Sequence, residues 1–367
     1  MKITFAIPYH HLTGGIRCIF ELSNALAERG HDCLVVSPFQ PYPMGETILG
    51  KVKRSIFAFA DCASRNWKGD TNGNGTEGQA DWIQLKFTYK AVRYLTNPYL
   101  PEGDYVVATN WKTASWVRAL DESKGKKRYL VFDIETWDRG TYSESDVEKT
   151  YHLIPHIMTY SSFVSRELGK LINRKPTAMF TLGVNQEKFY PDYEIEKDNS
   201  KIRVCMMMRR QPHKGMEDGL RVFDLVRKKC PQISLIAFGS REVEESVPSY
   251  VEFHRFPDDD ELRKIYSSCH IFLSTSRREG FNLTPLEAMA CGCAVVSTRT
   301  GAIPEYGTHK ETMMIREVGD VEGLAGDIVK LCSHPDEIKR LSRNSSQVVN
   351  KYSWDAAAES FERALEI

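Results

Sequence analysis

The feature that most constrains the fold of this chain is a repeated alternation of short apolar segments with helical segments. Residues 2–7 (KITFAI) form an apolar run, residues 16–30 repeat apolar side chains with the period of an amphipathic helix, and residues 33–37 (CLVVS) form the next apolar run. A strand, a helix and a second strand in this order make a βαβ unit with parallel strands. Because the alternation recurs along the chain, we expect an α/β fold built on parallel sheets.

The alternation divides the chain into two halves. In the first half we expect further strands at residues 104–110, 128–133 and 156–162, and helices at residues 112–123 and 143–154. In the second half we expect strands at residues 202–208, 233–239, 270–276, 293–298 and 312–317, and helices at residues 216–230, 259–269, 283–292 and 320–334. A polar stretch with a proline joins the halves near residues 185–200. These patterns predict two doubly wound domains, which suits a chain of 367 residues.

The composition excludes several classes of function. The chain has 49 basic and 49 acidic residues, so no net positive field favours nucleic acid as a partner. No apolar run approaches the roughly 20 residues of a membrane-spanning helix, and the N-terminal segment is too short and too polar for a signal peptide. The nine cysteines lie mostly in apolar runs, which indicates reduced thiols in a cytoplasmic protein. Cys291 and Cys293 lack the further ligands of a zinc site.

Two segments of the first half depart from the alternation. Residues 65–81 are rich in glycine and asparagine and lack an apolar period, which is typical of a loop. Residues 51–60 (KVKRSIFAFA) carry three positive charges that could contact an anionic membrane surface. An ordinary solvated segment is the favoured interpretation of this basic run.

Residues 278–292 (REGFNLTPLEAMACG) carry two glutamates where a strand is expected to lead into a helix. Ligands of open α/β sheets bind at the carboxyl ends of the strands, so this segment is a candidate site. Thr284 as N-cap, Pro285 at the first helical position and Glu287 three residues after Thr284 match a capping box. Taken alone, this pattern favours a structural role for Glu287.

The segment in front of this helix predicts a phosphate site. Residues 280–284 (GFNLT) offer a run of backbone amides at a helix N-terminus, where the helix dipole favours an anion. Gly280 permits a close approach of the chain to a ligand. Glu279 precedes that glycine, where capping does not explain it, so we expect its carboxylate to bind hydroxyl groups of a phosphorylated sugar.

A second loop supports the phosphate site. Residues 209–215 (RRQPHKG) follow the strand expected at 202–208 and place Arg209 and Lys214 at the carboxyl edge of the same sheet. An arginine fork and a lysine point charge together balance a diphosphate. Two solvated loop cations are the alternative interpretation, but the shared edge favours the diphosphate site.

These segments together resemble glycosyltransferase family 4, whose members are retaining, nucleotide-sugar-dependent enzymes of GT-B fold. Residues 279–305 resemble the family's E-x7-E segment, and residues 209–215 resemble its Arg-x4-Lys phosphate motif. Residues 14–37 resemble its opening Gly-Gly loop with the following helix and strand. Residues 182–191 resemble its interdomain signature, and residues 352–361 resemble its final helix. The resemblance implies two Rossmann-like domains that face a central cleft. The acceptor-side domain would span residues 1–185 with a final helix at 352–367, and the nucleotide-sugar-binding domain would span residues 186–351.

The resemblance also implies roles for individual residues. Glu279 would bind hydroxyl groups of the transferred sugar, and Glu287 would bind those of the ribose. Arg209 and Lys214 would stabilise the departing diphosphate. The other donor-binding positions would be backbone amides and glycines, namely Phe281, Asn282, Leu283, Gly14 and Gly15.

The implied reaction moves a sugar from a nucleotide-diphosphate sugar to a glycan or lipid-linked acceptor. Configuration would be retained if the acceptor attacks from the face of the leaving group, and neither a metal ion nor a bound cofactor would be needed. The resemblance favours a role in bacterial surface polysaccharide synthesis, in the cytoplasm and with a possible peripheral contact at the inner face of the membrane. The nucleotide base, the sugar and the acceptor stay open.

The sequence departs from the family pattern at three places. Met208 stands where the family usually has a glycine, and Leu182 stands where it usually has an asparagine. A histidine that many members place near the sugar is missing, and Asp133 and Glu135 stand in that segment instead. We therefore expect a different sugar or acceptor, with one of these acids serving the acceptor hydroxyl and a 6-deoxyhexose preferred to a hexose.

Other signals have simpler explanations. Asp258 and Asp260 resemble a metal motif, but they open an expected helix whose dipole they complement. The glycines at 14–15 lack the Gly-x-Gly-x-x-Gly spacing of a dinucleotide site, and the methionines at 206–208 fit a buried strand. Two alternatives to a transferase remain: a sugar-nucleotide-binding protein without transfer and, more weakly, a glycoside hydrolase that uses the two glutamates of the E-x7-E segment.

Overall fold

The computed structural model describes residues 1–9, 13–39, 76–77, 82–135, 142–197 and 201–367. These residues form two compact units. Unit 1 comprises Met1–Tyr160, Val164–Thr181 and Ala357–Ile367, and unit 2 comprises Ser161–Phe163 and Leu182–Ala356. The sequence places the corresponding boundaries after residues 185 and 351. The basic run at 51–60, and the loop expected at 65–81 apart from residues 76–77, lie outside the described residues.

Unit 1 is built on one sheet with the strand order β3-β4-β2-β1-β5-β6-β7-β8. The strands are β1 (Lys2–Ala6), β2 (Asp32–Pro38), β3 (Thr76–Glu77), β4 (Thr88–Val92), β5 (Tyr105–Ala108), β6 (Lys126–Leu130), β7 (Ile157–Thr159) and β8 (Ala178–Met179). All neighbours pair in parallel except β3, which runs antiparallel to β4. In the register of the central strand, Ile3 lies opposite Cys33 on one side and Tyr105 on the other.

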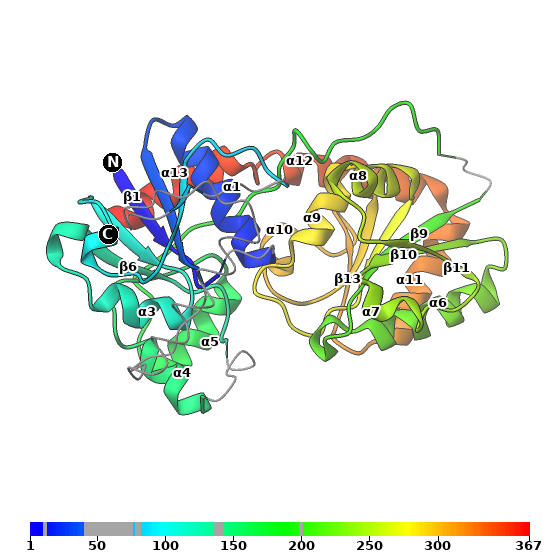
Figure 1. Cartoon of the computed structure of the whole chain (residues 1–367). Coiled ribbons are helices and arrows are strands. Elements are labelled where there is room, and N and C mark those ends of the chain that lie inside the picture. Colours follow the sequence, from blue (N-terminus) through cyan, green and yellow to red (C-terminus); the bar gives the residue numbers. More distant parts are fainter. Residues whose placement is uncertain (10–12, 40–75, 78–81, 136–141, 198–200) are drawn as a thin grey trace. The chain divides into compact units, whose positions relative to one another are not determined.

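The helices of the first part of the chain are α1 (Gly14–Glu28), α3 (Trp111–Arg118), α4 (Glu144–Thr150) and α5 (Ser162–Ile172), and α13 (Trp354–Glu366) returns to unit 1 near the end of the chain (Figure 1). Phe361 of α13 packs against Phe5 and Phe180, with ring centroids 5.6 and 5.1 Å apart. Buried Arg128 donates to the carbonyl oxygen of Leu365 at 2.6 Å. The final helix is therefore part of the unit 1 core.

Unit 2 has a parallel sheet with the order β11-β10-β9-β12-β13-β14. Its strands are β9 (Arg203–Met208), β10 (Ser234–Gly239), β11 (Val251–Arg255), β12 (Ile271–Ser274), β13 (Ala294–Thr298) and β14 (Met314–Arg316). Its helices are α6 (Met216–Lys229), α7 (Arg241–Glu244), α8 (Asp259–Ser268), α9 (Leu283–Ala290), α10 (Ile303–Tyr306), α11 (Val321–Ser333) and α12 (Pro335–Val349). Helices α6 and α11 cover one face, and α8, α9 and α12 cover the other (Figure 1).

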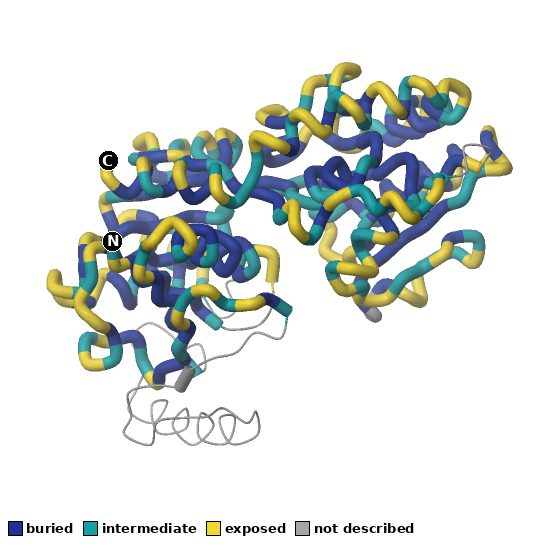
Figure 2. The backbone as a smooth tube through the Cα atoms, turned by 90° about the horizontal axis from the view of Figure 1, so that it is seen from above, coloured by how far each residue is buried: buried dark blue, intermediate teal, exposed yellow. Residues whose placement is uncertain are grey.

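The strands form the buried centre of each unit, whereas exposed residues gather on the outer helix faces and in loops (Figure 2). Met206 and Met208 are 1% and 0% exposed, which confirms that these two methionines fill the core, whereas Met207 between them is half-buried. Among the described cysteines none forms a disulfide, and all but Cys332 are buried. None of the described helices has the length and apolar character needed to span a membrane.

The strands expected from the sequence are all present, but some elements were not expected. Strands β4 and β11 carry polar side chains, and β11 lies at the edge of its sheet, so neither has the continuous apolar pattern of a central strand. Helices α5 and α12 also lack a sequence prediction. The expected cap at the start of α8 is confirmed: Asp258 accepts from the N–H of Glu261 at 2.8 Å in a capping box.

Candidate functional site

Strands β9 and β12 bring the two predicted loops of unit 2 together. They are parallel neighbours, with Leu273 opposite Met206, so the loops that follow them leave the same edge of the sheet. Gly215, at the end of the first loop, has φ +66, and an added Cβ there would lie 2.0 Å from the carbonyl oxygen of Thr275. Only glycine allows this backbone approach, which places Lys214 beside the second loop.

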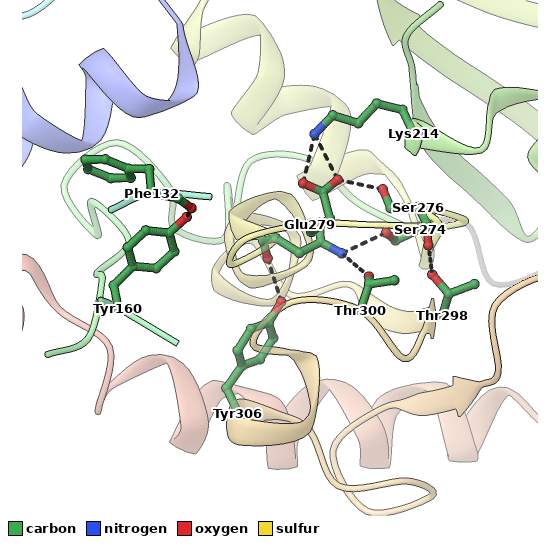
Figure 3. A network of polar contacts seen from close by, with 10 residues as sticks. Phe132, Tyr160, Lys214, Ser274, Ser276, Glu279, Thr298, Thr300 and Tyr306 are labelled. Atoms are coloured by element: carbon green, nitrogen blue, oxygen red, sulfur yellow. Dashed lines mark hydrogen bonds and ion pairs between the residues drawn. The ribbon is translucent and has the colours of Figure 1, made fainter. Parts of the chain in front are cut away.

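Lys214 and Glu279 form an ion pair at this edge (Figure 3). The Lys214 Nζ lies 2.9 and 2.8 Å from the two carboxylate oxygens, and the Ser276 hydroxyl donates to Oε1 at 2.7 Å. The side chains are 24% and 11% exposed, so both groups are shielded but reachable. Among the described residues, only the side chains of Lys214 and Ser276 contact the carboxylate of Glu279.

Further contacts fix the two loops to each other. The carbonyl of His213 accepts hydrogen bonds from the backbone N–H groups of Arg277 and Arg278 at 2.7 and 3.2 Å. The Thr275 hydroxyl donates to the carbonyl of Gly215 at 2.8 Å. Arg277 also binds Asp218 through two hydrogen bonds, and these raise the pKa of the guanidinium above its ordinary value.

Helix α9 begins without the predicted capping box. Its N-cap is Asn282, in the left-handed region with φ 73 and ψ 70, and no side chain caps the helix. Thr284 already lies inside the first turn, so the expectation that it pairs with Glu287 as a capping box is wrong. Because Pro285 occupies the third helical position and has no N–H, a side chain at Asn282 has no amide to accept from there. The capping explanation for Glu287 is therefore removed, and this residue lies half-buried on α9.

Buried contacts hold Asn282 in its left-handed conformation. Its Nδ2 donates to the hydroxyl of Ser274 at 3.2 Å and lies 3.5 Å from that of Thr300 (Figure 3). The Tyr306 hydroxyl donates to the carbonyl of Asn282 at 2.6 Å, and burial raises the pKa of this tyrosine well above 10, so the donor keeps its proton. No described residue accepts from the backbone N–H groups of Asn282 and Leu283, so two donors at the helix N-terminus stay open.

The other predicted donor-side residues have different environments. Arg209 follows β9, is exposed, and has no ion-pair or hydrogen-bond partner among the described residues. The ring of Phe281 is buried and stacks on Tyr306 at a centroid distance of 5.8 Å. The ring of Phe281 is therefore packed away from a ligand.

The predicted residues of unit 1 lie at the carboxyl edge of that unit's own sheet. Gly14 and Gly15 form the first turn of α1, where the hydroxyl of Thr13 accepts from the N–H of Ile16 at 3.3 Å. An added Cβ at either glycine would meet no described atom within 4 Å. The packing of the described chain therefore does not itself require glycine at these two positions.

Glu135 is bound to the start of α3. Its carboxylate accepts from Asn110 Nδ2 at 2.6 Å and from the backbone N–H of Trp111 at 3.0 Å. Asp133 accepts from the backbone N–H of Ile134 at 2.7 Å. Both acids follow β6, as the sequence predicts, and the geometry gives Glu135 a structural function at a helix N-terminus.

Sequence reasoning did not find Ser276, Asp218, Arg277 or Tyr306. Ser276 lies three residues before Glu279 and follows a strand, which is a weak local signal. Asp218 and Arg277 are 59 residues apart, so no local pattern links them. Among the described residues no group of three or more histidine, cysteine, aspartate or glutamate side chains could hold a metal ion.

Residues 201–334, which include both loops, match the family model described as Glycosyl transferases group 1. The chain is 29% identical over 203 residues to a probable sucrose-phosphate synthase of Thermosipho melanesiensis, a match that covers 50% of this chain and 46% of that protein. It is 23% identical to the D-inositol 3-phosphate glycosyltransferase of Corynebacterium urealyticum, over 76% of this chain and 63% of that protein. The chain thus spans less than two thirds of the length of these curated relatives.

Solved structures show the fold. The Anabaena protein HepE in complex with UDP and glucose has a TM-score of 0.71 at 15% identity and covers 100% of this chain and 99% of its own. Sucrose-phosphate synthase from Thermosynechococcus elongatus has a TM-score of 0.70 at 16% identity, with 100% and 98% covered. The predicted fold is confirmed: two α/β units of the GT-B fold. The predicted enzyme class is supported at the level of the domain, since residues 201–334 of unit 2 match the group 1 glycosyl transferase model.

Proposed function

We propose that this protein transfers a sugar from a nucleotide-diphosphate sugar to a glycan or lipid-linked acceptor. The observation that carries the proposal is the Lys214–Glu279 pair beside the uncapped N-terminus of α9. This pair lies within the segment that matches group 1 glycosyl transferases. Cations, open backbone N–H groups and a hydroxyl-binding carboxylate at one sheet edge suit a donor that carries both a diphosphate and a sugar.

The charges suggest how the donor binds. Without a ligand, Lys214 and Glu279 neutralise each other. A diphosphate would draw Lys214 and Arg209 towards its oxygens, and the released carboxylate of Glu279 would accept hydrogen bonds from sugar hydroxyl groups. Glu287, no longer explained as part of a cap, would bind the ribose in the way that the family resemblance implies.

The same groups would stabilise the transition state. As the bond between the sugar and the diphosphate breaks, negative charge develops on the leaving oxygen, and preorganised donors beside it lower the barrier. Lys214, Arg209 and the N–H groups of Asn282 and Leu283 are the donors in this proposal. The acceptor oxygen would form the new bond from the same face and give its proton to a phosphate oxygen, which retains the configuration without a protein nucleophile.

A donor panel tests this function. The protein is titrated with UDP, GDP, ADP and dTDP by calorimetry, and then incubated with the corresponding radiolabelled sugar donors with and without acceptor glycans. Transfer to an acceptor that is lost in Glu279→Gln is the expected result. Release of sugar from a simple glycoside without any nucleotide would instead indicate a hydrolase.

The alternative is a sugar-nucleotide-binding protein without transfer. The engagement of Glu135 with α3 favours this alternative, because that acid is occupied in the described structure. Nucleotide binding with no transfer from any donor would support it. Transfer of the labelled sugar from the donor to an acceptor would exclude this alternative.

Finer features of the reaction are part of the same proposal. We propose that no metal ion takes part, so transfer should survive EDTA. We further propose that a 6-deoxyhexose donor is preferred to the matching hexose and that Asp133 serves the acceptor hydroxyl. A role in surface polysaccharide synthesis in the cytoplasm, with peripheral membrane contact, would follow from a lipid-linked acceptor. A strong preference for a donor with a free 6-hydroxyl would contradict the sugar assignment.

A further inference from the structure

Asp218, whose carboxylate is buried, and the half-exposed Arg277 form a two-point ion pair beside the site. Arg277 donates through Nε to one carboxylate oxygen at 2.8 Å and through Nη2 to the other at 2.9 Å. The Asp218 side chain is 5% exposed and that of Arg277 is 50% exposed. Two parallel hydrogen bonds fix the relative orientation of both groups as well as their distance. The pair therefore holds the loop after β12 against the first turn of α6.

The pair acts on both segments that carry the site. Asp218 lies four residues after Lys214, in the first turn of α6, and Arg277 lies two residues before Glu279. The carbonyl of His213 accepts from the backbone N–H of Arg277 at 2.7 Å, so the same arginine is tied to the first loop through its backbone as well. A shift of Arg277 would therefore move Glu279 relative to Lys214.

The site pair cannot set this distance by itself. Lys214 has a flexible four-carbon stem and a point charge without directional preference. The contact of Asp218 with Arg277 is more directional, because two nitrogens of a planar guanidinium donate to the two oxygens of a buried carboxylate. Arg221 approaches the same carboxylate only to 3.9 Å, so it does not replace Arg277.

We propose that Asp218 and Arg277 are positioning residues that hold Glu279 and Lys214 at the spacing required for sugar transfer. This inference rests on the proposed function. Neither residue contacts the donor in this proposal. Both residues affect the reaction only through the geometry of the two loops.

A second ion pair in unit 2 supplies a matched control. Arg316 binds Asp327 through two hydrogen bonds of 2.7 and 2.6 Å, and the Asp327 side chain is 4% exposed. This pair joins β14 to α11 and contacts neither loop. Asp218→Asn and Asp327→Asn remove the same charge from equally buried, equally bonded sites. Arg277→Lys keeps its positive charge but loses the two-point contact.

The experiment measures kcat, KM, nucleotide diphosphate affinity and unfolding for these variants. We expect Asp218→Asn and Arg277→Lys to lower kcat by up to about 100-fold, the effect that a misplacement of roughly 1 Å can have, while diphosphate affinity changes little. Asp327→Asn should lose comparable stability and keep wild-type kcat. The double variant Asp218→Asn, Arg277→Lys should be no slower than the slower single variant, because both remove one contact.

Several outcomes would overturn the inference. Equal kcat in Asp218→Asn and Asp327→Asn would reduce the pair to a structural one. A loss confined to diphosphate affinity in Arg277→Lys would make Arg277 a ligand-binding residue. If the wild type transfers no sugar, the proposed function fails separately. Crystal structures of the two asparagine variants then decide the positioning effect, since an intact Lys214–Glu279 contact in Asp218→Asn would refute it.

Discussion

Helices α3 and α9 both follow an asparagine at the carboxyl edge of a parallel sheet, but only the N-terminus of α3 is capped by side chains. At α3, Asn110 caps the helix in a box with Thr113, and Glu135 adds a carboxylate that accepts from the N–H of Trp111. At α9, Asn282 is left-handed, turns its side chain towards Ser274, and caps nothing. The first terminus is satisfied by its own chain, and the second stays open.

The difference concerns which of the two helix N-termini has backbone N–H groups without a partner among the described residues. A helix N-terminus has four backbone N–H groups without intrahelical partners, and together with the dipole they attract anions. In α3 a built-in carboxylate already occupies that position. In α9 the nearby carboxylate, Glu279, precedes the helix and pairs with Lys214 instead. In the proposed function, this open terminus binds a phosphate of the donor.

The largest effect is expected from comparing the two carboxylates directly. Glu279→Gln should lower kcat for transfer by about 10²–10³-fold, the range for removing one preorganised polar group at the reaction centre, without weakening binding of the nucleotide diphosphate. Glu135→Gln should lower kcat far less. Steady-state kinetics and calorimetry on both variants measure this. Similar losses of activity in the two variants would contradict the different roles that we assign to Glu279 and Glu135.

The second largest effect on activity is expected from substitution of Lys214. Lys214→Ala removes the cation that we propose binds the diphosphate and should raise the barrier to transfer by roughly 2–4 kcal/mol. Unlike Glu279→Gln, it should also weaken binding of the free nucleotide diphosphate. Lys149→Ala, which removes a lysine that is 71% exposed on α4, is the matched control and should leave both quantities unchanged. A wild-type rate in Lys214→Ala would exclude the diphosphate assignment.

The two asparagines should differ in what they tolerate. Asn282→Ala removes the polar side chain that lets asparagine tolerate the left-handed region, which should cost about 1–2 kcal/mol of stability and lower activity as the open amides move. Asn282→Gly should keep the backbone and most activity, because glycine adopts this conformation freely. Urea unfolding and kinetics compare the two variants. If alanine is tolerated better than glycine, the left-handed start of α9 does not matter to the site.

The smallest effect concerns the closed terminus. Glu135→Ala removes both acceptors that the carboxylate offers to the start of α3, and it should cost about 0.5–2 kcal/mol of stability, as for loss of a helix cap. The loss should shrink in Glu135→Gln, which keeps one acceptor. Urea unfolding monitored by tryptophan fluorescence gives both values. Unchanged stability together with a large fall in kcat would show that Glu135 acts in the reaction and does not stabilise the start of α3.

Much of the fold and part of the site follow from local patterns in the sequence. The apolar runs locate the central strands, because a buried parallel strand needs a continuous apolar segment. The direction of those strands places residues 209–215 and 278–292 at carboxyl ends, and the neighbouring positions of β9 and β12 then bring these loops to the same edge. Edge strand β11 escaped prediction because its polar side chains face solvent on part of its length.

The tertiary structure alone decided which groups are partners. Lys214 and Glu279 are 65 residues apart, and the distance between their side chains depends on how β9 and β12 pack and on Gly215 allowing backbone contact. The capping box expected from Thr284 and Glu287 has the right local spacing, but the left-handed turn at Asn282 starts α9 earlier. Glu135, in turn, became a cap because β5 and β6 are neighbours. Periodicity and strand direction are local properties that a sequence determines. Hydrogen-bond partners depend on distances between segments that only the packed chain sets.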